Sequence, residues 1–158
     1  MRALVQRVSE GAVAIAGAET ARIGKGYVIL VCVRRGDTRE DALSLARKCA
    51  GLRIMEDAEG KMNLSLPDAG GSALVVSQFT LYADTRQGNR PGFGEAAPSE
   101  EAAPLYEAFL GRMKEMLGEE RVRSGEFRAM MSVRIVNDGP VTVLIECPIH
   151  NQPRSALS

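Results

Sequence analysis

The sequence has no tryptophan and a single histidine, His150, among its 158 residues. Ser-His-Asp and Cys-His catalytic arrangements need a histidine base that a third group holds in place. His150 belongs to segment 148–158, which contains two prolines and many polar side chains and is expected to be poorly ordered. The shortage of histidine therefore disfavours hydrolysis by the usual side-chain base.

Cysteine is also scarce, and Cys32, Cys49 and Cys147 lie far apart in the sequence. They form no CxxC pair, and the chain contains no HExxH motif, so neither a zinc site nor another metal or cofactor is expected. An odd number of cysteines among apolar neighbours is typical of buried, reduced thiols. This usage predicts a cytoplasmic protein.

Long hydrophobic runs and an excess of one charge are absent as well. No apolar run reaches about 18 residues, so we expect no transmembrane helix, and the residues before Arg7 do not form a signal peptide. Twenty basic residues balance twenty acidic residues. This balance excludes a protein that coats phosphate backbones, but it permits one that grips only the tip of an RNA.

The remaining composition is that of one soluble globular domain, with 45% hydrophobic and 25% charged residues. We expect this domain to span residues 1–147 and to have a mixed α/β fold. Helices are predicted over about 39–50, where Thr38 and Asp41 form an acidic capping box, and over about 100–117, where Pro104 favours a later start. Strands are predicted over about 2–8, 11–16, 27–33, 52–55, 72–81, 130–136 and 141–147.

One conspicuous segment is Ser77-Gln78-Phe79-Thr80-Leu81, at the end of a strongly apolar strand. Strand geometry places Gln78 and Thr80 on one face and Ser77 and Phe79 on the other. Polar residues at the end of a buried strand suit the floor of a site. The alternative is a strand end that simply runs out into solvent.

A second conspicuous segment, Asn137-Asp138-Gly139-Pro140, lies between the last two predicted strands. Asp-Gly is a hairpin signal, so an ordinary tight turn is one interpretation. A cis Gly139-Pro140 bond would instead indicate a special role, because few X-Pro bonds in folded proteins are cis. The local pattern does not decide between the two.

Taken together, the segments Ser77–Leu81 and Asn137-Asp138-Gly139-Pro140-Val141-Thr142 resemble the signatures of D-aminoacyl-tRNA deacylases. Gln6-Arg7-Val8 and other short stretches support the likeness, which extends over about residues 1–146. The resemblance implies a compact three-layer ββα sandwich of mixed sheets with two main helices. It also implies a cytoplasmic homodimer that hydrolyses the ester between a D-amino acid and the 3′ adenosine of tRNA, with no other protein partner.

For the site, the resemblance implies that residues 77–80 form the floor of a pocket at the dimer interface. Each subunit would offer Gly139-Pro140, joined by a cis peptide bond, to the partner's pocket. Their main-chain carbonyls would hold the substrate's α-ammonium and leave no room for an L side chain, while glycyl-tRNA would still be cleaved. Gly139, Pro140 and Met131 are thus expected to bind substrate and select its handedness.

The activated ester and the neighbouring ribose hydroxyl reduce the need for a protein base. A backbone N–H near Phe79 is the candidate oxyanion donor, with Ser77 and Gln78 as positioning groups. Thr80 is a second-ranked nucleophile, because a threonine hydroxyl without a base is weak. For the tRNA, we expect Phe93 to stack on the terminal adenine. Arg7 is expected either to contact the tRNA or to brace the partner's Gly139-Pro140 turn.

Two other functions remain open at this point. One is a small-ester hydrolase that uses Thr80 or Ser77 with His150 as the base, and the other is a dimeric binding module without catalysis. The chain also departs from the family pattern Phe-x-Ala-Asp-Met, since it reads Phe127-Arg128-Ala129-Met130-Met131. The arginine and the lost acid leave the edge of the pocket undefined.

Overall fold

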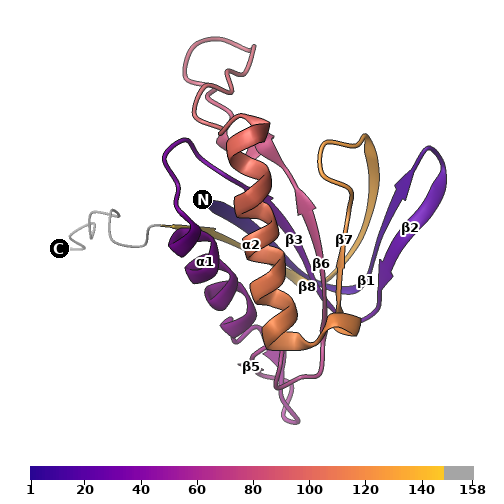
Figure 1. Cartoon of the computed structure of the whole chain (residues 1–158). Helices are drawn as coiled ribbons and strands as arrows, with labels where there is room; N and C mark the ends of the chain where they lie inside the picture. The colour runs from indigo at the N-terminus through magenta and orange to yellow at the C-terminus, as the bar shows by residue number, and fades with distance from the viewer. Residues whose placement is uncertain (148–158) are drawn as a thin grey trace.

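A computed structural model describes residues 1–147 of the chain (Figure 1). Segment 148–158, including His150, lies outside the described residues. In chain order the elements are β1 (Arg2–Ile15), β2 (Ala18–Ile23), β3 (Gly26–Cys32), α1 (Arg39–Gly51), β4 (Met55–Glu56), β5 (Met62–Leu64), β6 (Ser72–Ser77), η1 (Phe79–Tyr82), α2 (Ser99–Leu117), η2 (Glu119–Arg121), β7 (Val122–Ser124) and β8 (Met131–Glu146).

The strands of the main sheet follow the order β2-β1-β3-β6-β7, and β8 pairs with β1. The first half of β1 pairs with β3 and its second half pairs with β2, while β8 follows both halves. β1 and β8 therefore run from one part of the sheet into a second part that leans away from β3 and β6 (Figure 1). β3 and β6 are parallel neighbours, which places their carboxyl ends together.

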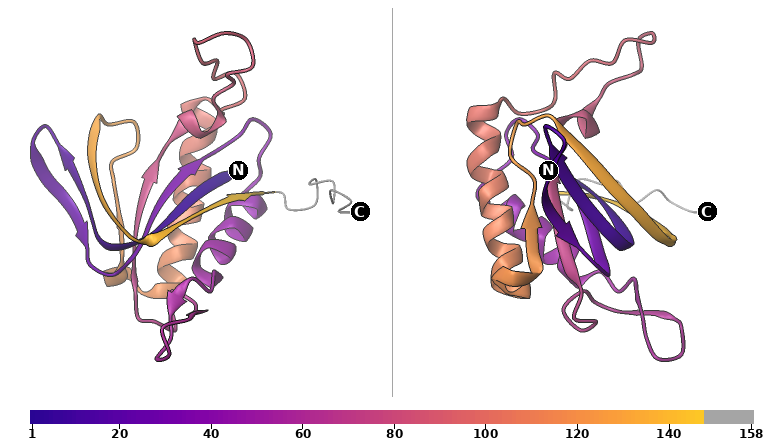
Figure 2. Two further views of the ribbon diagram at one scale, coloured as in Figure 1. Left: turned by 180° about the vertical axis from the view of Figure 1, so that it is seen from behind. Right: turned by 90° about the vertical axis from the view of Figure 1, so that its right-hand side faces the viewer.

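Two hydrophobic clusters show that the molecule has three layers. The larger cluster joins both helices to one face of the sheet, and these helices lie side by side in Figure 2. The second cluster joins the other face of β3 and β6 to the far halves of β1, β2 and β8. The layers are thus helices, main sheet and folded-over sheet, which confirms the expected ββα sandwich.

β1 is one continuous strand, so the prediction of separate strands over 2–8 and 11–16 is wrong. Gly11 lies where the two strands were expected to separate, but this glycine serves a close approach: a Cβ atom there would lie 2.6 Å from Val28 Cγ2. β1 changes register against β8 around Val8, where the strand bends. Glycine at position 11 therefore permits packing between the two sheet layers rather than chain reversal.

β8 is also continuous, so the ordinary tight turn that was one interpretation of Asn137–Pro140 is wrong, as are separate strands over 130–136 and 141–147. Gln6 pairs with Thr142 and Val8 pairs with Asn137, which leaves residues 138–141 opposite Arg7 alone. The segment is a bulge within one strand. Asn137 Oδ1 accepts a 3.0 Å hydrogen bond from Val141 N, closing the bulge locally. The Gly139-Pro140 peptide bond within it is cis.

Both predicted helices are present. The capping box of α1 is confirmed, because Thr38 Oγ1 accepts from Asp41 N and Asp41 Oδ2 accepts from Thr38 N. α2 begins at Ser99, so Pro104 lies inside the helix and does not delay its start. Pro104 and Glu100 are exposed, so water can solvate the Glu100 carbonyl that the proline leaves without a donor. Among residues 1–147, no helix is long and apolar enough to cross a bilayer.

Candidate active site

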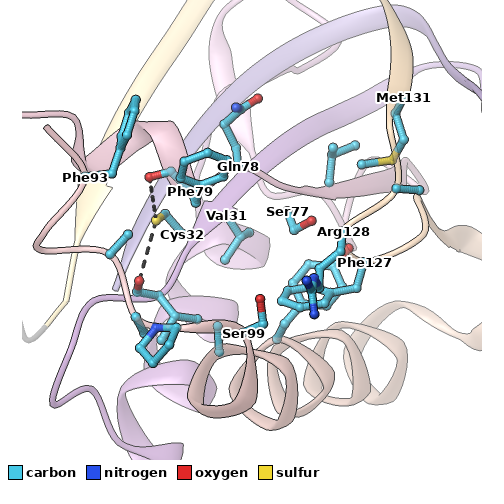
Figure 3. A pocket seen from close by; sticks show the side chains of 18 of the residues that line it. Val31, Cys32, Ser77, Gln78, Phe79, Phe93, Ser99, Phe127, Arg128 and Met131 are labelled. Carbon is cyan, nitrogen blue, oxygen red and sulfur yellow. Dashed lines mark hydrogen bonds between the residues drawn. The ribbon is translucent and has the colours of Figure 1, made fainter. Parts of the chain in front are cut away.

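A cleft of about 550 Å³ opens where β3 and β6 end, next to the first turns of α2 (Figure 3). Four parts of the chain line it: the ends of these strands, the segment leading into α2, the helix itself, and the segment between β7 and β8. The lining residues that carry the argument are Cys32, Ser77, Gln78, Phe79, Phe93, Tyr106, Phe127, Arg128 and Met131. Parallel strands that end at one edge are a common setting for a ligand site.

The floor of the cleft comes from the first conspicuous segment, but its geometry differs from the prediction. β6 ends at Ser77, and the chain turns into the 3-10 helix η1 at Phe79. Strand alternation therefore stops, and Gln78 Nε2 instead donates a 2.6 Å hydrogen bond to Thr80 Oγ1. Ser77, Gln78 and Phe79 line the cleft, whereas Thr80 does not.

Phe79 and Phe93 meet at the mouth of the cleft, although 14 positions separate them in the sequence. Their rings pack edge to face, with centroids 5.1 Å apart. Both rings remain accessible, with exposed fractions of 57% for Phe79 and 37% for Phe93. The site therefore presents an aromatic surface to solvent, which suits stacking with a planar base.

Two weak acids in the wall of the cleft are held neutral. Burial raises the pKa of the Cys32 thiol to about 11, and the thiol donates a hydrogen bond to the Phe79 carbonyl at 3.3 Å. Burial also raises the pKa of Tyr106, whose hydroxyl donates to the Val75 carbonyl at 3.1 Å. Neither histidine nor carboxylate lines the cleft within the described residues. The cleft therefore holds no group there that could act as a base near neutral pH.

One backbone N–H at the floor of the cleft has no acceptor among residues 1–147. η1 begins at Phe79, and the first N–H groups of a helix have no partner within the helix. Gln78 N donates to the Val31 carbonyl at 2.8 Å, while the Phe79 N–H finds no acceptor among residues 1–147. An N–H group free at the floor of a cleft can stabilise a developing oxyanion.

Gly139, Pro140 and Arg7 form a separate group that does not line this cleft. Arg7 is only 4% exposed. Its guanidinium donates to the Asp138 and Ile54 carbonyls, both at 2.9 Å, and contacts Glu56 Oε1 at 3.2 Å. Arg7 thus braces the bulge of its own chain rather than the turn of a partner, and its contact with RNA stays a prediction. Gly139 and Pro140 themselves are exposed.

The structure therefore brings together five of the residues predicted for the site: Ser77, Gln78, Phe79, Phe93 and Met131. The sequence interpretation missed the walls, which include Cys32, Tyr106 and Phe127. Cys32 lies within an apolar run and resembled an ordinary core cysteine, and Tyr106 lies on a helix far along the chain. No cluster of three or more metal-binding side chains occurs within residues 1–147.

With this geometry established, comparison with known proteins identifies the family. The family model described as D-Tyr-tRNA(Tyr) deacylase matches residues 4–146. The chain belongs to this deacylase family. A D-aminoacyl-tRNA deacylase of Roseiflexus castenholzii is 54% identical over 155 residues, covering 98% of each chain. Another from Salinibacter ruber is 56% identical over 146 residues, or 92% of this chain and 97% of the relative.

Solved structures show the same deacylase-family fold. A c-Myc DNA unwinding element binding protein is 38% identical with a TM-score of 0.90, covering 94% of this chain and 99% of that one. A probable eukaryotic D-amino acid tRNA deacylase has a TM-score of 0.78 over 91% of this chain and 97% of that one. It is 19% identical, so this second likeness concerns the fold alone.

Proposed function

We propose that this protein hydrolyses the ester bond between a D-amino acid and the 3′-terminal adenosine of tRNA, as an editing enzyme of the cytoplasm. The observation that carries the proposal is the likeness to D-aminoacyl-tRNA deacylases at above 50% identity over nearly the whole chain. The cleft agrees with that activity, because an activated ester with a neighbouring ribose hydroxyl needs positioning more than it needs a base.

In the proposed mechanism, the terminal adenine stacks on Phe93 at the mouth of the cleft. Ser77 and Gln78 position the ester at the floor. The Phe79 N–H donates to the carbonyl oxygen as a water molecule attacks, with the vicinal hydroxyl of the ribose assisting. The aromatic contact between Phe79 and Phe93 supports this arrangement, because it places the base-stacking surface next to the proposed oxyanion donor.

Selection of the D form is proposed to depend on a second copy of the chain. Gly139 and Pro140 are exposed and do not line the cleft of their own subunit. A twofold dimer could bring them to the cleft of the partner, beside Met131. There, their carbonyl groups would accept hydrogen bonds from the substrate's α-ammonium. The close main chain would exclude an L side chain, whereas a D side chain would point outward.

A covalent mechanism through Thr80 is less well supported. The Thr80 hydroxyl accepts from the Gln78 amide, which is a donor at that contact and cannot take a proton from it. Thr80 also lies outside the cleft lining. The small-ester alternative would further need His150 as its base, and His150 lies outside the described residues.

The test is hydrolysis of matched D-tyrosyl-tRNA and L-tyrosyl-tRNA, with glycyl-tRNA as a third substrate. We expect the D ester and the glycyl ester to be cleaved and the L ester to persist, because glycine has no side chain to clash with the main-chain wall. His150→Ala should leave these rates nearly unchanged, whereas the small-ester mechanism requires near-complete loss. If the protein binds tRNA but hydrolyses none of the three esters, it is a binding module instead.

A further inference from the structure

Arg128 is a charged side chain at the cleft that the proposed mechanism does not use. It lines the cleft beside Phe127, across from Phe93 (Figure 3). The segment that carries it is anchored close to the floor. Gly125 N donates to the Val75 carbonyl at 3.0 Å, and the Phe127 and Tyr106 rings lie 5.5 Å apart. The base of the Arg128 side chain is therefore held at a defined place on the rim.

The charge of Arg128 is available to a ligand. Its guanidinium makes no hydrogen bond or ion pair with any of residues 1–147, unlike Arg2, Arg7 and Arg34, which are all paired. The side chain is exposed, and no carboxylate lines the same cleft within the described residues. Glu126 is the nearest acid in the sequence, and it does not line the cleft. The rim is therefore locally cationic, although the whole chain has no net charge.

The backbone at Arg128 adopts φ +69°, a conformation that residues with a side chain rarely adopt. A glycine would take this conformation without cost. The arginine therefore adds a guanidinium to the rim at a position where the backbone itself favours glycine. An exposed guanidinium at such a position can recognise an anionic ligand by charge-assisted hydrogen bonds.

We propose that Arg128 binds a phosphodiester group in the 3′-terminal strand of the tRNA substrate. The proposal rests on the proposed deacylase function, which places the terminal adenosine between Phe93 and the floor. The strand that precedes the adenosine, on its 5′ side, must leave across the rim of the cleft. A guanidinium on that rim can make a bidentate, charge-assisted contact with a phosphate.

The test compares two substrates that carry the same ester. One is D-tyrosyl-tRNA, and the other is D-tyrosyl-adenosine, which has the base and ribose but no phosphate. Arg128→Ala should raise KM for the tRNA about tenfold with little change in kcat, and should leave kcat/KM for the adenosine ester unchanged. The slope of log kcat/KM against log salt on tRNA should become shallower by about 0.7, the value for one contact with a single strand.

Three control variants separate charge from backbone effects. Arg128→Lys should retain part of the tRNA affinity, and Arg128→Gly should lose as much as the alanine variant while relieving the positive φ. Arg123→Ala removes an exposed arginine from β7, outside the cleft lining. This variant should leave KM and kcat/KM unchanged for both substrates. Equal losses on both substrates, an unchanged salt slope, or wild-type KM in Arg128→Gly would overturn the proposal. Failure of the wild type to cleave either substrate would instead reject the deacylase function.

Discussion

At the scale of single residues, Phe79 contributes two different groups to the proposed site. Its ring packs against Phe93, and its N–H begins η1 without an acceptor among residues 1–147. The Cys32 thiol donates a hydrogen bond to the carbonyl of Phe79. Because the main chain is fixed in this way, the N–H can be preorganised for an oxyanion without any side-chain rearrangement.

We expect Phe79→Pro to lower kcat for D-tyrosyl-tRNA by a hundredfold or more, since proline has no N–H to donate, and losing one oxyanion donor costs about that much. Phe79→Ala is the matched control, because it removes the ring but keeps the N–H. It should affect mainly KM. Single-turnover kinetics measure both, with circular dichroism confirming the fold. A Phe79→Pro enzyme with near-normal kcat would exclude this N–H as the donor.

Residue patterns drew attention to the segment that lines the cleft but did not predict its shape. Ser77 and Gln78 stood out as polar residues at the end of a buried apolar strand, and their place in the floor of a site was implied by the family resemblance. The turn into η1 was missed, since Phe, Thr, Leu and Tyr are all common in strands and carry no turn signal. Contacts between Phe79 and Phe93, or between Cys32 and Phe79, depend on how distant segments pack. Local spacing contains no information about them.

At the scale of elements, the start of α1 shows how a short motif determines a helix boundary. Burial alone would raise the pKa of Asp41, but hydrogen bonds from the Thr38 hydroxyl and N–H hold that pKa below its ordinary value. The folded state therefore favours the ionised carboxylate. Its contribution to stability is complete above the unfolded pKa of about 4 and is lost as the pH falls through the lower folded pKa.

Asp41→Asn should accordingly lower the free energy of unfolding by about 0.5–1 kcal/mol at pH 7. The difference from wild type should begin to narrow as the pH falls below about 4 and should vanish once the pH is below the lower pKa of the folded carboxylate. Urea denaturation at a series of pH values measures both effects. Glu40→Gln, which removes a neighbouring first-turn charge outside the box, is the control. A difference in the free energy of unfolding between the two proteins that stays constant down to pH 2 would show that the charge of Asp41 is not involved.

The long strands were the elements least accessible to sequence reasoning. β1 and β8 each contain a segment that locally reads as a turn, at Gly11 and at Asn137–Pro140. In the folded chain, pairing over both halves of the two strands overrides these local signals. By contrast, β3 and α1 were predicted well. β3 is an unbroken apolar run that is buried on both faces, and α1 repeats its apolar residues at helical spacing.

At the scale of the whole molecule, β8 is a 16-residue strand that pairs only with β1 among the described elements. Val136 and Leu144 on this strand are 44% and 54% exposed. A long edge strand with exposed apolar side chains is a ready surface for pairing with another chain. This feature supports the proposed homodimer, in which β8 would also carry Gly139 and Pro140 toward the partner.

We expect the double variant Val136→Lys with Leu144→Lys to shift the protein toward the 17.0 kDa monomer, because like charges would face each other across a twofold axis. Deacylation of D-tyrosyl-tRNA should fall with the dimer fraction. Light scattering reports the mass. Ala18→Lys places the same charge on the exposed strand at the other end of the sheet and should alter neither property. A fully active monomer would contradict the shared site.

The cleft and the Arg7-braced bulge are separate places on one subunit, and in the proposed homodimer with a shared site this separation has a genetic consequence. A chain damaged only at Phe79 and a chain damaged only at Gly139 would each be inactive as pure dimers. In a mixed population, however, half the dimers would contain one of each and would assemble one complete site from the two intact halves. The two inactive variants should therefore complement each other when they are expressed together, and should restore about a quarter of the wild-type deacylase activity.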